Sequence, residues 1–130
     1  MSTVEKSAVT PLDGLARTLR GEPAYAREGH AARSLVHAPD LRVLLVAIRA
    51  GAKMAEHQAT QTATVHLLSG ALQLRVPGTT LDLVEGELLR LEAGLLHDVL
   101  AKTDSAFLLT LGHASSSGAH SATEEATSSV

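Results

Sequence analysis

The chain has no cysteine and no tryptophan, and its 130 residues include one tyrosine and one phenylalanine. Without cysteine, both a disulfide framework and a thiolate metal site are excluded. Because aromatic residues make up 2 % of the chain and the formal net charge is −3, there are few rings for bases to stack on and no attraction to phosphates. We therefore expect no nucleic-acid partner.

Long apolar runs are also absent. No segment approaches the 18 uninterrupted apolar residues of a membrane-spanning helix, and residues 1–15 lack an apolar region of signal-peptide length. We expect a soluble, cytoplasmic protein with no membrane partner. The chain is long enough for one domain with a single core, which must consist mainly of Leu, Val, Ala and Ile.

The two ends of the chain differ from its middle. Apolar residues at helical spacing between Leu12 and Leu19, followed by Gly21 and Pro23, predict a short amphipathic helix. Residues 114–130 are rich in Ser, Thr and Ala with little to bury, which predicts a disordered tail. We expect an N-terminal helix or arm over residues 1–30, a β domain over 31–113 and this tail.

The middle of the chain has the pattern of short strands. Apolar alternation between Gly, Pro and Asp punctuation predicts eight of them, at spacings of roughly 8–12 residues. They are expected at Ala32–His37, Leu41–Arg49, Ala63–Ser69, Leu72–Val76, Leu81–Val84, Glu87–Glu92, Asp98–Lys102 and Ser105–Leu111. This arrangement is typical of an all-β sandwich or barrel.

Two histidines stand in corresponding places among these strands. In the segment GAKMAEHQATQTATVHLLSG, His57 follows Gly51 by six residues and precedes Gly70 by thirteen. His97 follows Gly94 by three residues, and Gly94 follows Gly86 by eight. Over roughly residues 41–112, the chain resembles a small single-domain cupin (RmlC-like jelly-roll family). The first cupin motif matches at the first two glycines and His57, and the second at the other two glycines and His97.

The resemblance implies an all-β fold of the cupin type: a double-stranded β-helix, or jelly-roll barrel, with a short N-terminal helix. It also implies where metal ligands should stand. The second histidine and the glutamate of the first motif are replaced here by Ala59 and Ala63, and Glu92 and Ala101 stand at the motif's proline and asparagine. His57 and His97 therefore remain as two candidate metal ligands. A catalytic metal usually keeps three side-chain ligands, so a divalent Zn, Fe, Ni or Mn ion would need a third group.

Two functions stay open. In the first, the chain binds a small molecule in an aliphatic cavity lined by Ala59, Ala63, Val65 and Leu67, with His57 and His97 as its polar groups and no firm dependence on a metal. In the second, it is a metal-dependent enzyme, dioxygenase- or isomerase-like, with the two histidines as ligands and an unidentified third. Whether the chain is an enzyme is undecided at this point, and imidazole could also act as a general base without a metal.

Several other polar residues have simpler interpretations. His66 is expected to face away from the interior by strand alternation, as are Glu56 and Asp98 because each adjoins a motif histidine. The sequence leaves open whether His30, His37 or His113 reaches the mouth of the barrel. The arginines are interpreted as solvated edge or face residues, with one of them as an alternative site for a carboxylate ligand; they are Arg42, Arg49, Arg75 and Arg90.

Two structural expectations complete the analysis. The four motif glycines are expected at turns or bulges that need a positive φ. The apolar face of the N-terminal helix (Leu12, Leu15, Leu19) is hard to place on a lone barrel, so we expect it to cross to a second copy in a homodimer.

Overall fold

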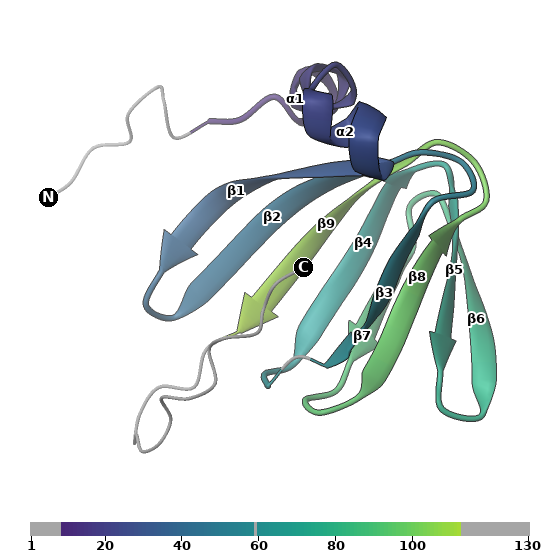
Figure 1. Ribbon diagram of the computed structural model, residues 1–130. Coiled ribbons are helices and arrows are strands. Elements are labelled where there is room, and N and C mark those ends of the chain that lie inside the picture. Colours follow the sequence, from purple (N-terminus) through teal and green to yellow (C-terminus); the bar gives the residue numbers. More distant parts are fainter. Residues whose placement is uncertain (1–8, 59, 113–130) are drawn as a thin grey trace, which may run out of the picture.

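The chain folds into two short helices followed by nine strands (Figure 1). The computed structural model describes residues 9–58 and 60–112, and at residues 56–58 it describes the backbone. The helices are α1 (Leu12–Arg20) and α2 (Pro23–Glu28). The strands are β1 (His30–Ala38), β2 (Leu41–Ile48), β3 (Lys53–Gln58), β4 (Ala63–Ser69), β5 (Ala71–Val76), β6 (Thr79–Val84), β7 (Leu88–Leu91), β8 (Leu96–Ala101) and β9 (Ser105–Gly112).

The strands form two antiparallel sheets with the order of a jelly roll. The five-stranded sheet has the order β1-β2-β9-β4-β7 and the four-stranded sheet the order β3-β8-β5-β6. From β2 onward, each strand pairs with the one at the same distance from the other end of the series: β2 with β9, β3 with β8, β4 with β7 and β5 with β6. This is a long hairpin wrapped across two sheets, as in a jelly roll. The predicted all-β class is confirmed.

The main core lies between the two sheets. Because successive side chains on a strand point to opposite faces, alternate residues enter this core. On β4 these are Ala63, Val65 and Leu67, each almost fully buried, while the residues between them are half-buried on the other face. The single phenylalanine, Phe107 on β9, is the largest buried side chain of the same cluster. The predicted strand at 63–69 is confirmed residue for residue.

A second core lies under the helices. Leu19 is fully buried, and it packs with Ala16 and Tyr25 against Leu45 and Ala47 on the outer face of β2. Burial of a leucine side chain contributes about 1.5–3 kcal/mol. The expectation that this helix face crosses to a second copy is wrong, because the five-stranded sheet of the same chain covers it.

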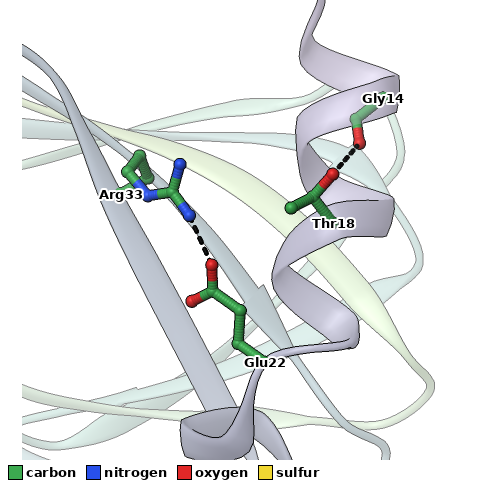
Figure 2. Close-up of polar contacts among 4 residues, drawn as sticks. All are labelled: Gly14, Thr18, Glu22 and Arg33. Carbon is green, nitrogen blue, oxygen red and sulfur yellow. Dashed lines mark hydrogen bonds and ion pairs between the residues drawn. The ribbon is translucent and has the colours of Figure 1, made fainter.

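Polar contacts also stabilise the helical segment, one within α1 and one between the segment and β1 (Figure 2). Thr18 donates from its hydroxyl to the carbonyl of Gly14, one turn earlier in α1, at 3.2 Å. Arg33 on β1 forms an ion pair with Glu22, which stands between the two helices. The first helix begins and ends where its sequence pattern predicts, whereas α2 was not expected. Pro23 occupies the first turn of α2, where a missing N–H costs nothing.

The eight expected strands all form, and the ninth, β3, was not among them. The four motif glycines all have a positive φ, as predicted: 83° at Gly51, 96° at Gly70, 89° at Gly86 and 83° at Gly94. Gly70 alone joins β4 to β5, where the chain passes from one sheet to the other. No helix among residues 9–58 and 60–112 combines the length and apolar character needed to cross a membrane. The predicted tail at 114–130 lies outside the described residues.

Candidate functional site

A β-bulge sets the register of the two motif histidines. Met54 on β3 stands opposite Val99 on β8, and the next pair in register is His57 with His97. Regular pairing would place Glu56 opposite His97, so the register shift between Met54 and His57 adds one residue on β3. In an antiparallel pair, residues directly opposite each other share one face of the sheet. The structure therefore brings the backbones of the two predicted site residues together.

His97 is buried in the interior. It is 5 % exposed and alternates with Val99 and Ala101, both members of the core between the sheets. Its Nδ1 lies 3.1 Å from the carbonyl oxygen of Leu95, so Nδ1 is assigned as the donor of this hydrogen bond. In the neutral ring, Nε2 then carries the lone pair and acts as the acceptor. A ring held in this way suits a hydrogen-bond acceptor, a general base or a metal ligand.

Asp98 points to the other side of β8, as predicted. Its carboxylate accepts hydrogen bonds from Arg75 on β5, at 2.8 Å from Nη2 and 3.3 Å from Nε. The Arg75 hydrogen bonds hold the pKa of the Asp98 carboxyl below its usual range, against the opposing effect of burial. The pair thus stabilises the outer face of the four-stranded sheet and leaves the carboxylate away from His97.

The same outer face carries a shallow pocket that sequence reasoning missed. Its volume is about 530 Å³. It is lined by Lys53, Ala55, Arg75, Val76, Pro77, Leu96 and Asp98. Only strand pairing reveals it, because these residues come from β3, from β5 and the turn after it, and from β8, which are far apart in sequence. Since the pocket opens on the side of β8 opposite to His97, it is separate from the histidine site.

Three other histidines, His30, His37 and His66, lie on the five-stranded sheet. His66 is half-buried on the face of β4 opposite to Ala63, so the prediction that it faces away from the interior is confirmed. His30 and His37 lie on the edge strand β1, and His37 is exposed and pairs in register with Arg42. His113, like Ala59, lies outside the described residues.

The described aliphatic residues that were predicted to line a ligand cavity are part of the core between the sheets. Ala63 and Val65 are each 2 % exposed and pack in the cluster between the sheets, together with Leu67. The cavity that they were expected to line stays a prediction.

Among the described side chains, no donor set fits a metal held by three side chains. Ala63 stands at a motif ligand position and carries no donor atom. Across the part of the chain that the structure describes, no three His, Asp or Glu residues gather in a cluster that could hold an ion. Two imidazoles remain as candidate ligands, fewer than a catalytic site normally keeps.

The four arginines have four different surroundings. Arg90 is exposed beside Glu92, and Arg49 donates to the carbonyl of Tyr25 at 3.1 Å. Arg75 pairs with Asp98, as described above. Arg42 is half-buried, and its Nε is buried without a hydrogen-bond partner. At Nε, this arginine thus departs from its interpretation as a solvated residue.

Comparison with known proteins supports the fold. No protein-family model and no curated protein matches the chain. The chain is similar to the solved structure of a conserved protein of unknown function from Streptococcus pyogenes, at 22 % identity and a TM-score of 0.70, over 88 % of this chain and 95 % of that one. It is also similar to an RmlC-like cupin from Shewanella frigidimarina, at 17 % identity and a TM-score of 0.63, over 67 % and 78 % of the two chains.

A third similar structure is that of an enzyme. Salicylate 1,2-dioxygenase from Pseudoaminobacter salicylatoxidans, solved with gentisate, gives 19 % identity and a TM-score of 0.71 over 79 % of this chain and 32 % of the larger one. At such identities a structural likeness establishes the fold alone. This chain thus has the cupin-type jelly-roll fold, which confirms the fold that its two motifs predicted.

Proposed function

We propose that the chain binds a small organic molecule at the end of the jelly roll where His57 and His97 stand opposite each other, without depending on a firmly held metal. The observation that carries this proposal is the buried imidazole of His97. This polar ring is 5 % exposed among apolar neighbours, and its Nδ1 donates to the Leu95 carbonyl, which fixes the orientation of the ring.

The surroundings favour a guest with an apolar body. Ala63 and Val65 are small aliphatic side chains on the inner face of β4, and Ala59 is expected to join them. Ligand sites of this kind combine apolar walls with a few polar groups that fix orientation. His97, with His57 opposite it in the register, would supply those groups.

The metal-dependent enzyme is the alternative. Its support is the pair of motif histidines in register and the likeness to a dioxygenase fold. Against it stands the donor set, because a third ligand would have to come from outside the described side chains. Any catalytic role of the site therefore belongs to this alternative or to imidazole acting as a base.

The two functions are separated by metal analysis and ligand binding on the same protein. The full chain, purified without an affinity tag, is expected to carry less than about a tenth of an equivalent of any transition metal, as expected where fewer than three ligands hold it. A panel of small organic molecules is then screened by thermal unfolding. A ligand at ten times its Kd stabilises by about 1.4 kcal/mol, which raises the Tm of a domain of this size by about 5 °C.

The variant His97→Gln tests the site, with His66→Gln as the matched control on the opposite face of β4. We expect the first variant to lose most of the ligand-induced Tm increase and the second to keep it. A full equivalent of a transition metal would favour the enzyme. An unchanged response in His97→Gln would refute the proposed site.

The homodimer and the cytoplasmic location stay predictions. The helix face that suggested a dimer is covered within the chain, so a dimer would need another surface. Light scattering at micromolar concentration checks this, and a monomer mass would contradict the dimer.

A further inference from the structure

Arg42 lies on the inner face of β2. The residues at even positions of this strand, Leu44, Val46 and Ile48, belong to the core between the sheets. Strand alternation places Arg42 on the same face. Its register partner on β9, Leu111, is itself a buried member of that core.

One nitrogen of the Arg42 guanidinium, Nε, lacks an acceptor among the described residues. This nitrogen is buried without a hydrogen-bond partner, and no ion pair found among the described residues includes it. Buried polar groups in native proteins are nearly always paired, because an unpaired one forfeits the hydrogen bonds that it made with water. An acceptor supplied by a bound molecule would remove this cost.

One row of residues runs in register across the whole five-stranded sheet at this end. Each member pairs with the next on the neighbouring strand. From β1 to β7, the row consists of His37, Arg42, Leu111, Ala63 and Leu91. The row holds no carboxylate, and three of its five members are buried apolar residues.

Two short connections place this row at the same end of the jelly roll as His57 and His97. Residues 59–62 join the end of β3 to Ala63 at the start of β4, and residues 92–95 join Leu91 at the end of β7 to the start of β8. The row on the five-stranded sheet and the histidine pair on the four-stranded sheet therefore lie at the same end of the sandwich. Packed sheets are separated by roughly 10 Å, a distance that the side chains of the two inner faces bridge.

We propose that Arg42 binds the carboxylate of the ligand, which makes the ligand a small monocarboxylate with an apolar body. This proposal rests on the proposed function and names its ligand class. The guanidinium fork matches a carboxylate in a two-bond arrangement. The apolar body extends from the guanidinium toward the row's aliphatic residues, Ala63, Leu91 and Leu111.

The test compares carboxylates with neutral amides of the same shape. The probes are butanoate, hexanoate, octanoate and benzoate, each paired with its primary amide, and their Kd values are measured by calorimetry with the full chain. We expect the best carboxylate to bind at least about tenfold more tightly than its amide, the gain typical of a charge-assisted hydrogen bond. The NMR signal of the Arg42 Nε–H should shift when hexanoate or benzoate is added.

Three variants complete the design. Arg42→Gln should remove the preference for carboxylate while amide binding stays as in the wild type, which also shows that the variant is folded. Arg42→Lys keeps the positive charge but loses the two-bond geometry of the guanidinium. Its preference for carboxylate over amide should lie between those of the wild type and Arg42→Gln. Arg90→Gln removes an exposed arginine at the far edge of the same sheet and should change nothing.

Each outcome decides a different question. Equal binding of carboxylates and amides, or a preference that survives in Arg42→Gln, overturns the role of Arg42 and leaves the small-molecule site standing. A wild-type chain that binds none of the probes overturns the carboxylate proposal, while the broader ligand panel still decides the proposed function.

Discussion

Replacement of Gly70 by alanine should be the most damaging single-methyl change in the chain. Gly70 has φ +96° and connects β4 to β5 without any other residue. A β-carbon built there would lie 2.2 Å from Oγ of Ser105 and 2.5 Å from the carbonyl oxygen of Asp104. The second of these atoms belongs to the backbone, so the segment between β8 and β9 must move.

The magnitude follows from three contributions. A left-handed conformation costs a non-glycine residue about 1–2 kcal/mol. Overpacking against rigid neighbours adds roughly 1–3 kcal/mol. Ser105 is fully buried, accepts a hydrogen bond from the Ala71 N–H at 3.1 Å and donates to the carbonyl of Thr103 at 2.8 Å. Displacing its hydroxyl loses about 1 kcal/mol more. We expect Gly70→Ala to lower the free energy of unfolding by about 4 kcal/mol.

The control is Gly78→Ala. Gly78 has φ +83°, and a β-carbon there would meet nothing within 4 Å. It therefore isolates the conformational cost of about 1–2 kcal/mol. Urea unfolding followed by circular dichroism measures both variants. If their free energies of unfolding agreed within about 0.5 kcal/mol, the close approach of Gly70 to the Asp104–Ser105 backbone would be refuted.

Three further predictions concern charged and ionisable side chains. Arg42→Met removes a buried nitrogen without an acceptor, so thermal unfolding of the ligand-free chain should show a gain of about 1 kcal/mol, or about 4 °C in Tm; a loss would contradict the unpaired state. The hydrogen bonds from Arg75 lower the pKa of the Asp98 carboxyl, so an NMR titration should give a pKa below the ordinary value of 3.8. In Arg75→Gln, the pKa of Asp98 should return toward that value. Since the folded pKa is the lower one, this pair stabilises the fold above pH 3.8, and the contribution is lost as the pH falls through the folded value; a variant Asp98→Asn should lack that dependence. Burial, and then the negative charge of Asp104, raise the pKa of Tyr25, so an absorbance titration should give a midpoint above the ordinary 10.0. The chain has no other tyrosine and no tryptophan, so the signal belongs to Tyr25 alone. A midpoint at or below 10.0 would contradict the burial of this side chain.

The sequence predicts strands well where one face is apolar and the other polar. The segment from Ala63 to Ser69 alternates regularly, and its strand boundaries are those expected. Alternation does not predict β3, for two reasons. Its sequence, KMAEHQ, has only Met54 as a large apolar residue, and it contains a bulge that breaks the two-residue period. The glycine spacing around His57, and not alternation, is what marks this strand.

The candidate site is harder to predict, for a physical reason that β2 illustrates. The sequence LRVLLVAI is apolar on both faces because one face packs against the other sheet and the other face packs under the helices. Alternation then cannot tell which side of the strand Arg42 occupies. The helix face at Leu19 has the same ambiguity: an amphipathic pattern predicts that a face is buried, and only the tertiary structure shows what covers it.

The two functions considered for this end of the molecule require ligands of opposite charge, a metal cation in one case and a carboxylate in the other. Arg42 is permanently charged, and its row lies at the same end of the sandwich as the histidine pair, on sheets of a kind that pack roughly 10 Å apart. A divalent cation held between His57 and His97 would be repelled by about 3 kcal/mol at an effective dielectric constant of about 20. That energy corresponds to more than a hundredfold in affinity. The same charge attracts a carboxylate, so an arginine on this inner face favours an organic anion in the position where other members of the fold could hold a metal. The proposed ligand class thus depends on one residue of this chain, Arg42, a property that the shared fold does not transfer.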